Sequence, residues 1–248
     1  MAGLGWLTAR PIAHRGLHDA ASGLIENTPS AFAAAIAGNY AIECDLQISS
    51  DGEAMVHHDD RLGRLNDGDA QLRTKSAAEL QAVKFKATSD RMQTLKELLT
   101  QVSGRVPLVL EMKSRFDGDV RLPARMAEIV RGYSGPVAAM SFDPDQVAEI
   151  ARIAPSLTRG IVAERWYADK EWAPLPQRQK WIMGNLLHVP RTRPHFVNYS
   201  LKDLPAVAPL VARYALGMPL LVWTVRSAAD RAKAQRWADQ MVFEGFRP

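Results

Sequence analysis

Short apolar runs alternate with amphipathic stretches along almost the whole chain. Eight runs have the length and composition of buried strands, and they cover residues 10–15, 41–49, 106–113, 136–142, 158–164, 195–200, 219–225 and 240–245. Helical periodicity appears between most of them, at residues 27–39, 94–102, 143–154 and 227–238. Strands that alternate with helices in this way predict parallel βαβ units.

Eight such strands in one chain of this length predict a closed (β/α)8 barrel, with residues 1–248 as a single domain. No G-x-G-x-x-G motif follows the first strand, which disfavours an open dinucleotide-binding sheet. The polar segment at about residues 61–93 is expected to be an insertion after the second strand that lies over one end of the barrel. The sequence stops after the eighth strand, so we expect the last barrel helix to be missing or replaced by another element.

The first predicted helix carries clear boundary signals. Thr28 can cap its start, Pro29 suits the first turn, and Gly38 with Asn39 ends it. The pair Asp51-Gly52 after the second strand is a hairpin signal.

Composition is that of an ordinary globular protein, with 47% hydrophobic and 23% charged residues. Lys and Arg outnumber Asp and Glu by 31 to 27, and this small excess is spread without a basic block, so we expect no nucleic-acid partner. The single cysteine, Cys44, excludes an internal disulfide and is compatible with a reducing compartment. We find no signal peptide and no apolar run long enough to span a membrane, which favours the cytoplasm. The oligomeric state stays open, a homo-oligomer included.

Charged side chains gather at the ends of the predicted strands. Glu43 and Asp45 share one face of their strand and Cys44 points to the other, while Glu111 and Lys113 share a face of the next barrel strand. Three carboxylates from two nearby strands can form an oxygen cage for Mg²⁺ or Ca²⁺. The alternative is a structural ion-pair network in which Lys113 neutralises Glu111.

Histidines add to this pattern. His14 and Arg15 end the first strand, and Gly16 allows a sharp turn after them. The sequence "VHHDD" holds His57 and His58, of which only one can face a given site on an extended chain. Two histidines at neighbouring strand ends beside carboxylates suit general acid and base roles.

These residues form an ordered set of motifs. "HRG", "ENT", "ECD", "HDD" and "EMK" follow one another within residues 12–113, and "VWTV" lies at residues 222–225. Together they resemble the glycerophosphodiester phosphodiesterase family. The resemblance implies a (β/α)8 barrel with a divalent metal that hydrolyses glycerophosphodiesters to an alcohol and sn-glycerol 3-phosphate. Attack by the substrate's own 2-hydroxyl, through a cyclic phosphate, would explain why no serine or cysteine nucleophile is evident.

The resemblance also implies a role for each matching residue. The roles are metal ligation by Glu43, Asp45 and Glu111 and acid–base catalysis by His14 and His58. Arg15 and Lys113 would bind the phosphate, Glu26 would orient Arg15 or a substrate hydroxyl, and Trp223 would line the pocket. The family motif places a histidine directly before the acidic residue, which selects His58 rather than His57 and makes Asp59 a residue that fixes the loop or the ring of His58. Core packing is an equal alternative for Trp223.

Two further functions are also compatible with the sequence. One is a lysophospholipase D, because the segment at residues 164–181 carries three tryptophans near basic residues that could contact lipid. The other is a non-catalytic phosphodiester-binding barrel, although pure binding would not need a paired acid and base. The C-terminal "VFEGFRP" lacks the threonine–aspartate ending common in the family, and Glu244 within it has no assigned role.

Overall fold

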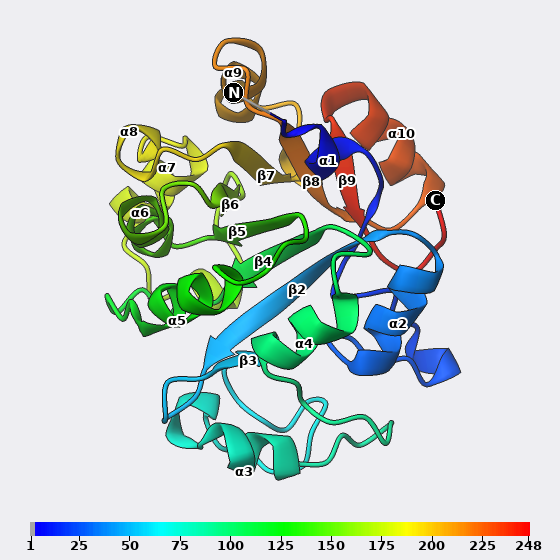
Figure 1. Cartoon of the computed structure of the whole chain (residues 1–248). Coiled ribbons are helices and arrows are strands. Elements are labelled where there is room, and N and C mark those ends of the chain that lie inside the picture. Colours follow the sequence, from blue (N-terminus) through cyan, green and yellow to red (C-terminus); the bar gives the residue numbers. More distant parts are fainter. Residues whose placement is uncertain (1–2) are drawn as a thin grey trace.

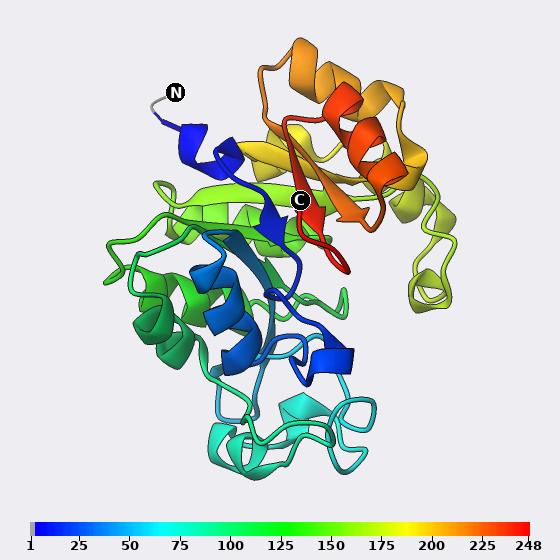
Figure 2. The same cartoon turned by 90° about the vertical axis from the view of Figure 1, so that its right-hand side faces the viewer.

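The computed structural model describes residues 3–248, and a closed barrel forms its centre (Figures 1 and 2). In the described part of the chain, eight parallel strands make the wall: β1 (Ile12–Ala13), β2 (Ala41–Ile48), β4 (Leu108–Met112), β5 (Val137–Ser141), β6 (Thr158–Ala163), β7 (Phe196–Ser200), β8 (Leu220–Val225) and β9 (Gln240–Phe243). Strand β1 pairs in parallel with both β2 and β9, which closes the sheet. The predicted (β/α)8 barrel is confirmed.

Helices connect successive strands and cover the outside of the barrel (Figure 1). They are α2 (Pro29–Ala37), α4 (Leu95–Val102), α5 (Arg121–Val130), α6 (Pro144–Ile153), α7 (Gln177–Gly184), α8 (Val189–Thr192), α9 (Val207–Tyr214) and α10 (Ala228–Trp237). Two short helices lie outside this pattern, α1 (Gly5–Thr8) before the first strand and α3 (Ala77–Ala82) in the insertion. Thr28 stands at the N-cap position of α2 as expected, but its hydroxyl donates to the Ile25 carbonyl (2.8 Å) and accepts no hydrogen bond from a backbone N–H of the helix.

Alternation along each strand separates two buried clusters. Outward residues such as Cys44 pack with the surrounding helices. Inward residues form a second cluster inside the barrel: Ile12, Ala41, Val109, Ala138, Met140, Val162, Phe196, Leu221 and Val242, joined by Leu7 of α1. Two positions further along five of these strands stand His14, Glu43, Glu111, Trp223 and Glu244. Because side chains repeat their direction every second residue, the barrel brings these five to the same C-terminal end.

The insertion after β2 begins with a hairpin. Strand β3 (Ala54–Val56) runs antiparallel to β2, and Gly52 turns between them at φ +82°. The segment at residues 61–93 then builds its own apolar cluster, which also takes in Ile25 and Met55. It therefore packs against the loop after β1 through Ile25 and against β3 through Met55.

The outer face of β9 is covered without a following helix. The ring of Phe243 packs edge-on against Tyr40 (centroids 5.0 Å apart) and Phe246 (5.6 Å). These aromatic rings pack on the outer face of β9. Within residues 3–248, no helix has the length and apolar character needed to cross a membrane.

Candidate active site

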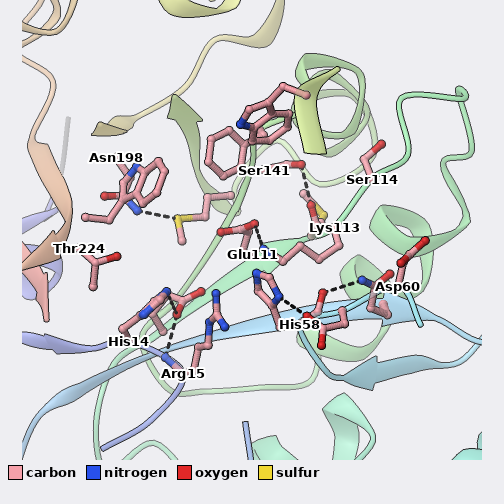
Figure 3. Close-up of a pocket in the computed structure, with 18 of the residues that line it drawn as sticks. His14, Arg15, His58, Asp60, Glu111, Lys113, Ser114, Ser141, Asn198 and Thr224 are labelled. Carbon is pink, nitrogen blue, oxygen red and sulfur yellow. Dashed lines mark hydrogen bonds and ion pairs between the residues drawn. The ribbon is translucent and has the colours of Figure 1, made fainter. Parts of the chain in front are cut away.

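A cavity of about 830 Å³ opens at the C-terminal ends of the strands. Charged side chains line one part of it: His14, Arg15, Glu43, His58, Glu111 and Lys113. Aromatic side chains line another part: Phe116, Phe142, Trp172 and Trp223. Figure 3 shows His14, Arg15, His58, Glu111 and Lys113 converging on the same space, with Asn198 and Thr224 across from His58. The cavity thus has a polar part suited to a phosphate and an apolar part beside it.

The three predicted carboxylates meet at the base of this cavity. Oxygens of Glu43, Asp45 and Glu111 lie within 4.8 Å of one another, and all three side chains are buried. Burial, together with the neighbouring charges of Asp45 and Glu111, raises the pKa of Glu43 well above its ordinary value. One of its oxygens, Oε1, is buried without a hydrogen-bond partner. A hard divalent cation fits this set of oxygen donors and would satisfy that oxygen.

The alternative ion-pair network is also present around the same carboxylates. Lys113 Nζ lies 2.8 Å from Asp45 Oδ1 and 2.5 Å from Glu111 Oε1, and Arg15 Nε lies 3.3 Å from Asp45 Oδ2. Burial alone would raise the pKa of Asp45, but the charges of Lys113, His58 and Arg15 outweigh it and lower this pKa. These cations leave Glu43 as the least compensated of the three carboxylates.

The "ENT" motif fixes the loop after β1 against β2. Arg15 and Asn27 both have left-handed backbone conformations (φ +55° and +56°), and the Asn27 amide N–H donates to the Arg15 carbonyl (2.9 Å). The Asn27 side chain donates to Asp45 Oδ2 (2.8 Å) and accepts from the Asp45 backbone N–H (3.2 Å). Glu26 accepts from Arg15 (2.7 Å). The loop therefore presents Arg15 to the carboxylates with its guanidinium held from both sides.

Each cavity histidine is held by a carboxylate at Nδ1. His14 Nδ1 lies 2.5 Å from Glu244 Oε2, and His58 Nδ1 lies 2.8 Å from Asp59 Oδ1. Burial lowers the pKa of His14 below its ordinary value, in spite of the Glu244 carboxylate. His14 Nε2 lies 3.9 Å from Glu43. In each ring Nδ1 is thus engaged by a carboxylate, which leaves Nε2 as the nitrogen that can exchange a proton with a substrate.

His57 lies away from the cavity and is buried. Its Nδ1 lies 3.0 Å from the Asp59 carbonyl and its Nε2 lies 2.9 Å from Asn66 Oδ1. We expect His57→Ala to keep kcat within a few-fold of wild type while lowering the free energy of unfolding by roughly 1–3 kcal/mol, because buried polar partners are left unsatisfied. Initial rates and urea unfolding of the same preparation check both parts. A kcat loss equal to that of His58→Ala would show that the two histidines were distinguished wrongly.

Arg64 connects the insertion to the site. It donates to Glu26 (2.7 and 3.0 Å) and to Asp59 (2.7 and 3.1 Å), the residues that hold Arg15 and His58. Burial opposes ionisation of Glu26, but Arg64 and Arg15 together lower its pKa to about 2. The Arg64 side chain is 47% exposed, so its ion pairs should contribute at most about 1 kcal/mol.

Arg64→Ala should therefore reduce kcat/KM by no more than about fivefold, since 1.4 kcal/mol corresponds to a factor of ten. Arg64→Lys, which keeps the charge, serves as the control and should lose less. Steady-state kinetics of the two variants decides this. A loss above 100-fold for Arg64→Ala would mean that Arg64 itself contacts the substrate.

Among the residues of this site, Glu244, Arg64 and Asn198 received no role from the sequence. Glu244 and Asn198 are each two positions beyond an inward apolar residue, Val242 and Phe196, so the alternation that located Glu43 also pointed to them. Arg64 lies in an irregular segment, where no periodicity gives side-chain directions. His18, for which the sequence indicated no role at the site, has its Nε2 atom 3.5 Å from Glu244 Oε2.

Comparison with known proteins gives a match over nearly the whole chain. The sequence profile of the Glycerophosphoryl diester phosphodiesterase family matches residues 14–246. The Bacillus subtilis protein YhdW is 29% identical over 236 residues, which cover 90% of this chain and 89% of YhdW. A glycerophosphodiester phosphodiesterase of Caldanaerobacter subterraneus subsp. tengcongensis is 28% identical over 161 residues, 61% of this chain and 65% of that protein.

Solved structures share the fold. A phosphodiesterase of Oleispira antarctica, in complex with the product sn-glycerol 3-phosphate, superposes with a TM-score of 0.78 at 20% identity and covers 96% of this chain and 94% of its own. The glycerophosphodiester phosphodiesterase of Thermotoga maritima gives a TM-score of 0.70 at 23% identity, with 94% and 92% of the two chains covered.

Proposed function

This chain belongs to the glycerophosphoryl diester phosphodiesterase family, enzymes that hydrolyse phosphoric diesters, and we propose that it cleaves glycerophosphodiesters to an alcohol and sn-glycerol 3-phosphate with a bound divalent cation. The observation that carries this proposal is the arrangement of His14 and His58, each supported by a carboxylate, around the buried cluster of Glu43, Asp45 and Glu111. A small-molecule substrate agrees with the product bound by the Oleispira antarctica relative.

Glu43, Asp45 and Glu111 would hold the cation, either Mg²⁺ or Ca²⁺, because both prefer oxygen ligands. When bound, it supplies positive charge to the phosphoryl oxygens and lowers the pKa of a substrate hydroxyl. Arg15 and Lys113 would add N–H donors to the same oxygens, where negative charge accumulates in the transition state. Trp223 would form part of the pocket wall, since it lines the cavity and packs edge-on against Phe142, with the ring centroids 5.4 Å apart.

His14 and His58 would move the protons. The oxygen of the substrate's 2-hydroxyl attacks phosphorus, the bond from phosphorus to the alcohol oxygen breaks, and a cyclic phosphate forms. One histidine takes the hydroxyl proton and the other gives a proton to the departing alcohol oxygen. Water then attacks phosphorus and opens the ring, while the two histidines exchange roles and return to their starting protonation. The product is sn-glycerol 3-phosphate.

A test of this proposal is the release of glycerol 3-phosphate from glycerophosphocholine, glycerophosphoethanolamine and glycerophosphoinositol. We expect release with Mg²⁺ or Ca²⁺ and none with a chelator. Release that is absent with every diester and metal would overturn the proposal. The cytoplasm remains the expected compartment.

One observation favours a lysophospholipase D as a second candidate. The aromatic part of the cavity includes Trp172 and Leu175 from the tryptophan-rich segment, and Trp166 and Trp181 of that segment are 66% and 61% exposed. An acyl chain could lie along such a surface. Activity on lysolipids that depends on detergent, without activity on glycerophosphocholine, would favour this candidate over the first.

A further inference from the structure

Glu244 follows the last strand and lies against the first. The His14 backbone N–H donates to the Phe243 carbonyl (2.9 Å), so barrel closure places the two side chains next to each other although they are 230 positions apart. The Glu244 carboxylate Oε2 lies 2.5 Å from His14 Nδ1. Its other oxygen, Oε1, accepts from Arg226 Nε (2.6 Å). Oε1 thus faces Arg226, whereas Oε2 faces His14 and, at 3.5 Å, His18 Nε2.

The charges around Glu244 keep it ionised. Burial opposes ionisation, but His14, His18 and Arg226 together hold the pKa of Glu244 far below its ordinary value. An ionised carboxylate only accepts hydrogen bonds, so His14 Nδ1 must carry a proton in this contact. In the neutral ring, Nε2 is then the nitrogen with the free electron pair, and this is the atom 3.9 Å from Glu43.

We propose that Glu244 is a positioning residue that holds His14 in the Nδ1–H tautomer and directs Nε2 toward the substrate. The inference rests on the proposed function. It implies that each histidine of the acid–base pair is oriented by a carboxylate. His58 is held in the same way by its sequence neighbour Asp59, whereas His14 receives its carboxylate from the opposite end of the chain. The unusual C-terminal "VFEGFRP" therefore supplies a working part of the site.

Because Arg226 contacts Glu244, the inference predicts an unusual ranking of substitutions at position 244 by their effect on turnover. In Glu244→Gln, the Arg226 N–H donors select the amide oxygen, which leaves the amide NH₂ group facing His14. An NH₂ group donates, so His14 Nδ1 must become the acceptor and its proton moves to Nε2. Glu244→Ala only removes the support. The near-isosteric glutamine should therefore be worse for turnover than alanine.

We expect Glu244→Gln to lower kcat by roughly 10²–10⁴-fold with KM changed less than about threefold, the upper end being the loss caused by a wrong histidine tautomer in a catalytic triad. Glu244→Ala should lose about tenfold, and Glu244→Asp should recover most of the wild-type rate. Asp239→Asn is the matched control, since Asp239 pairs with Arg213 beside the same strand but outside the cavity, and its kcat should be unchanged.

Nitrogen NMR of the imidazole ring gives a readout that needs no substrate. Wild-type His14 should show protonated Nδ1 and free Nε2, and Glu244→Gln should show the reverse. A wild-type Nε2–H tautomer, or equal wild-type kcat in the glutamine and alanine variants, would overturn the inference. Losses that follow the melting temperature would do the same. If wild type hydrolyses no glycerophosphodiester, the proposed function fails while the tautomer result still stands or falls separately.

Discussion

Removal of the divalent cation is expected to lower the rate of glycerophosphodiester hydrolysis by at least about 10³-fold, because several kcal/mol of charge stabilisation at the phosphoryl oxygens would be lost. Glu43 is the residue through which this dependence is best examined. It is the carboxylate whose pKa burial raises and whose Oε1 has no protein partner. Glu43→Gln should lose activity to a similar extent, and added metal should not restore it.

The Glu43→Gln variant and its control distinguish loss of the metal from misfolding of the protein. The glutamine can still accept from the Arg15 backbone N–H, as Glu43 does at 2.9 Å, so the loop after β1 should keep its position. Glu149→Gln, which breaks an exposed pair with Arg152 on α6, is the control and should behave as wild type. After chelation and dialysis, Mg²⁺ or Ca²⁺ should restore the wild-type rate. Full activity in protein shown by elemental analysis to be metal-free would contradict the account.

Loss of either cavity histidine is the second large effect. His14→Ala and His58→Ala should each lower kcat by roughly 10²–10⁴-fold, the usual contribution of a positioned acid or base. The kcat of the double variant should be only slightly below that of the less active single variant, because the effects of residues that act as a unit are not additive. His195→Ala, which alters a histidine near the opposite end of β7, should retain normal kcat and serves as the control.

A substrate with a good leaving group assigns the two roles. Glycerophospho-p-nitrophenol releases an anion that needs no proton, so the variant that lacks the acid should regain most of its rate. The variant that lacks the base should stay impaired on the same substrate. Near-normal turnover of both variants on glycerophosphocholine would show that the acid–base assignment is wrong.

The periodicity of apolar residues in the strands was enough to predict most of the fold. The eight predicted runs coincide with the eight wall strands, and the alternation that placed Glu43 and Asp45 on one face is the one observed. The first strand is shorter than predicted, Ile12–Ala13 instead of residues 10–15. Pro11 has no N–H to pair, and Arg15 turns away in a left-handed conformation.

Contacts that depend on closure or on irregular loops were not predictable in the same way. Glu244 meets His14 only because β9 pairs with β1, and no local pattern records that partner. Arg64 reaches Glu26 across 38 positions from a segment without strand or helix periodicity. The sequence therefore predicted the charged residues that meet at the base of the cavity, but not Glu244 and Arg64, which contact them from the far end of the chain and from the insertion.

Phosphorus NMR of glycerophosphocholine turnover tests the central claim most directly, because it shows which phosphorus–oxygen bond is broken. With Mg²⁺ or Ca²⁺, the diester signal should be replaced by that of sn-glycerol 3-phosphate, with a cyclic phosphate as the intermediate species. His58→Ala should leave the diester unchanged over the same time. A diester that binds without turnover, or that yields phosphocholine and glycerol, would contradict the account.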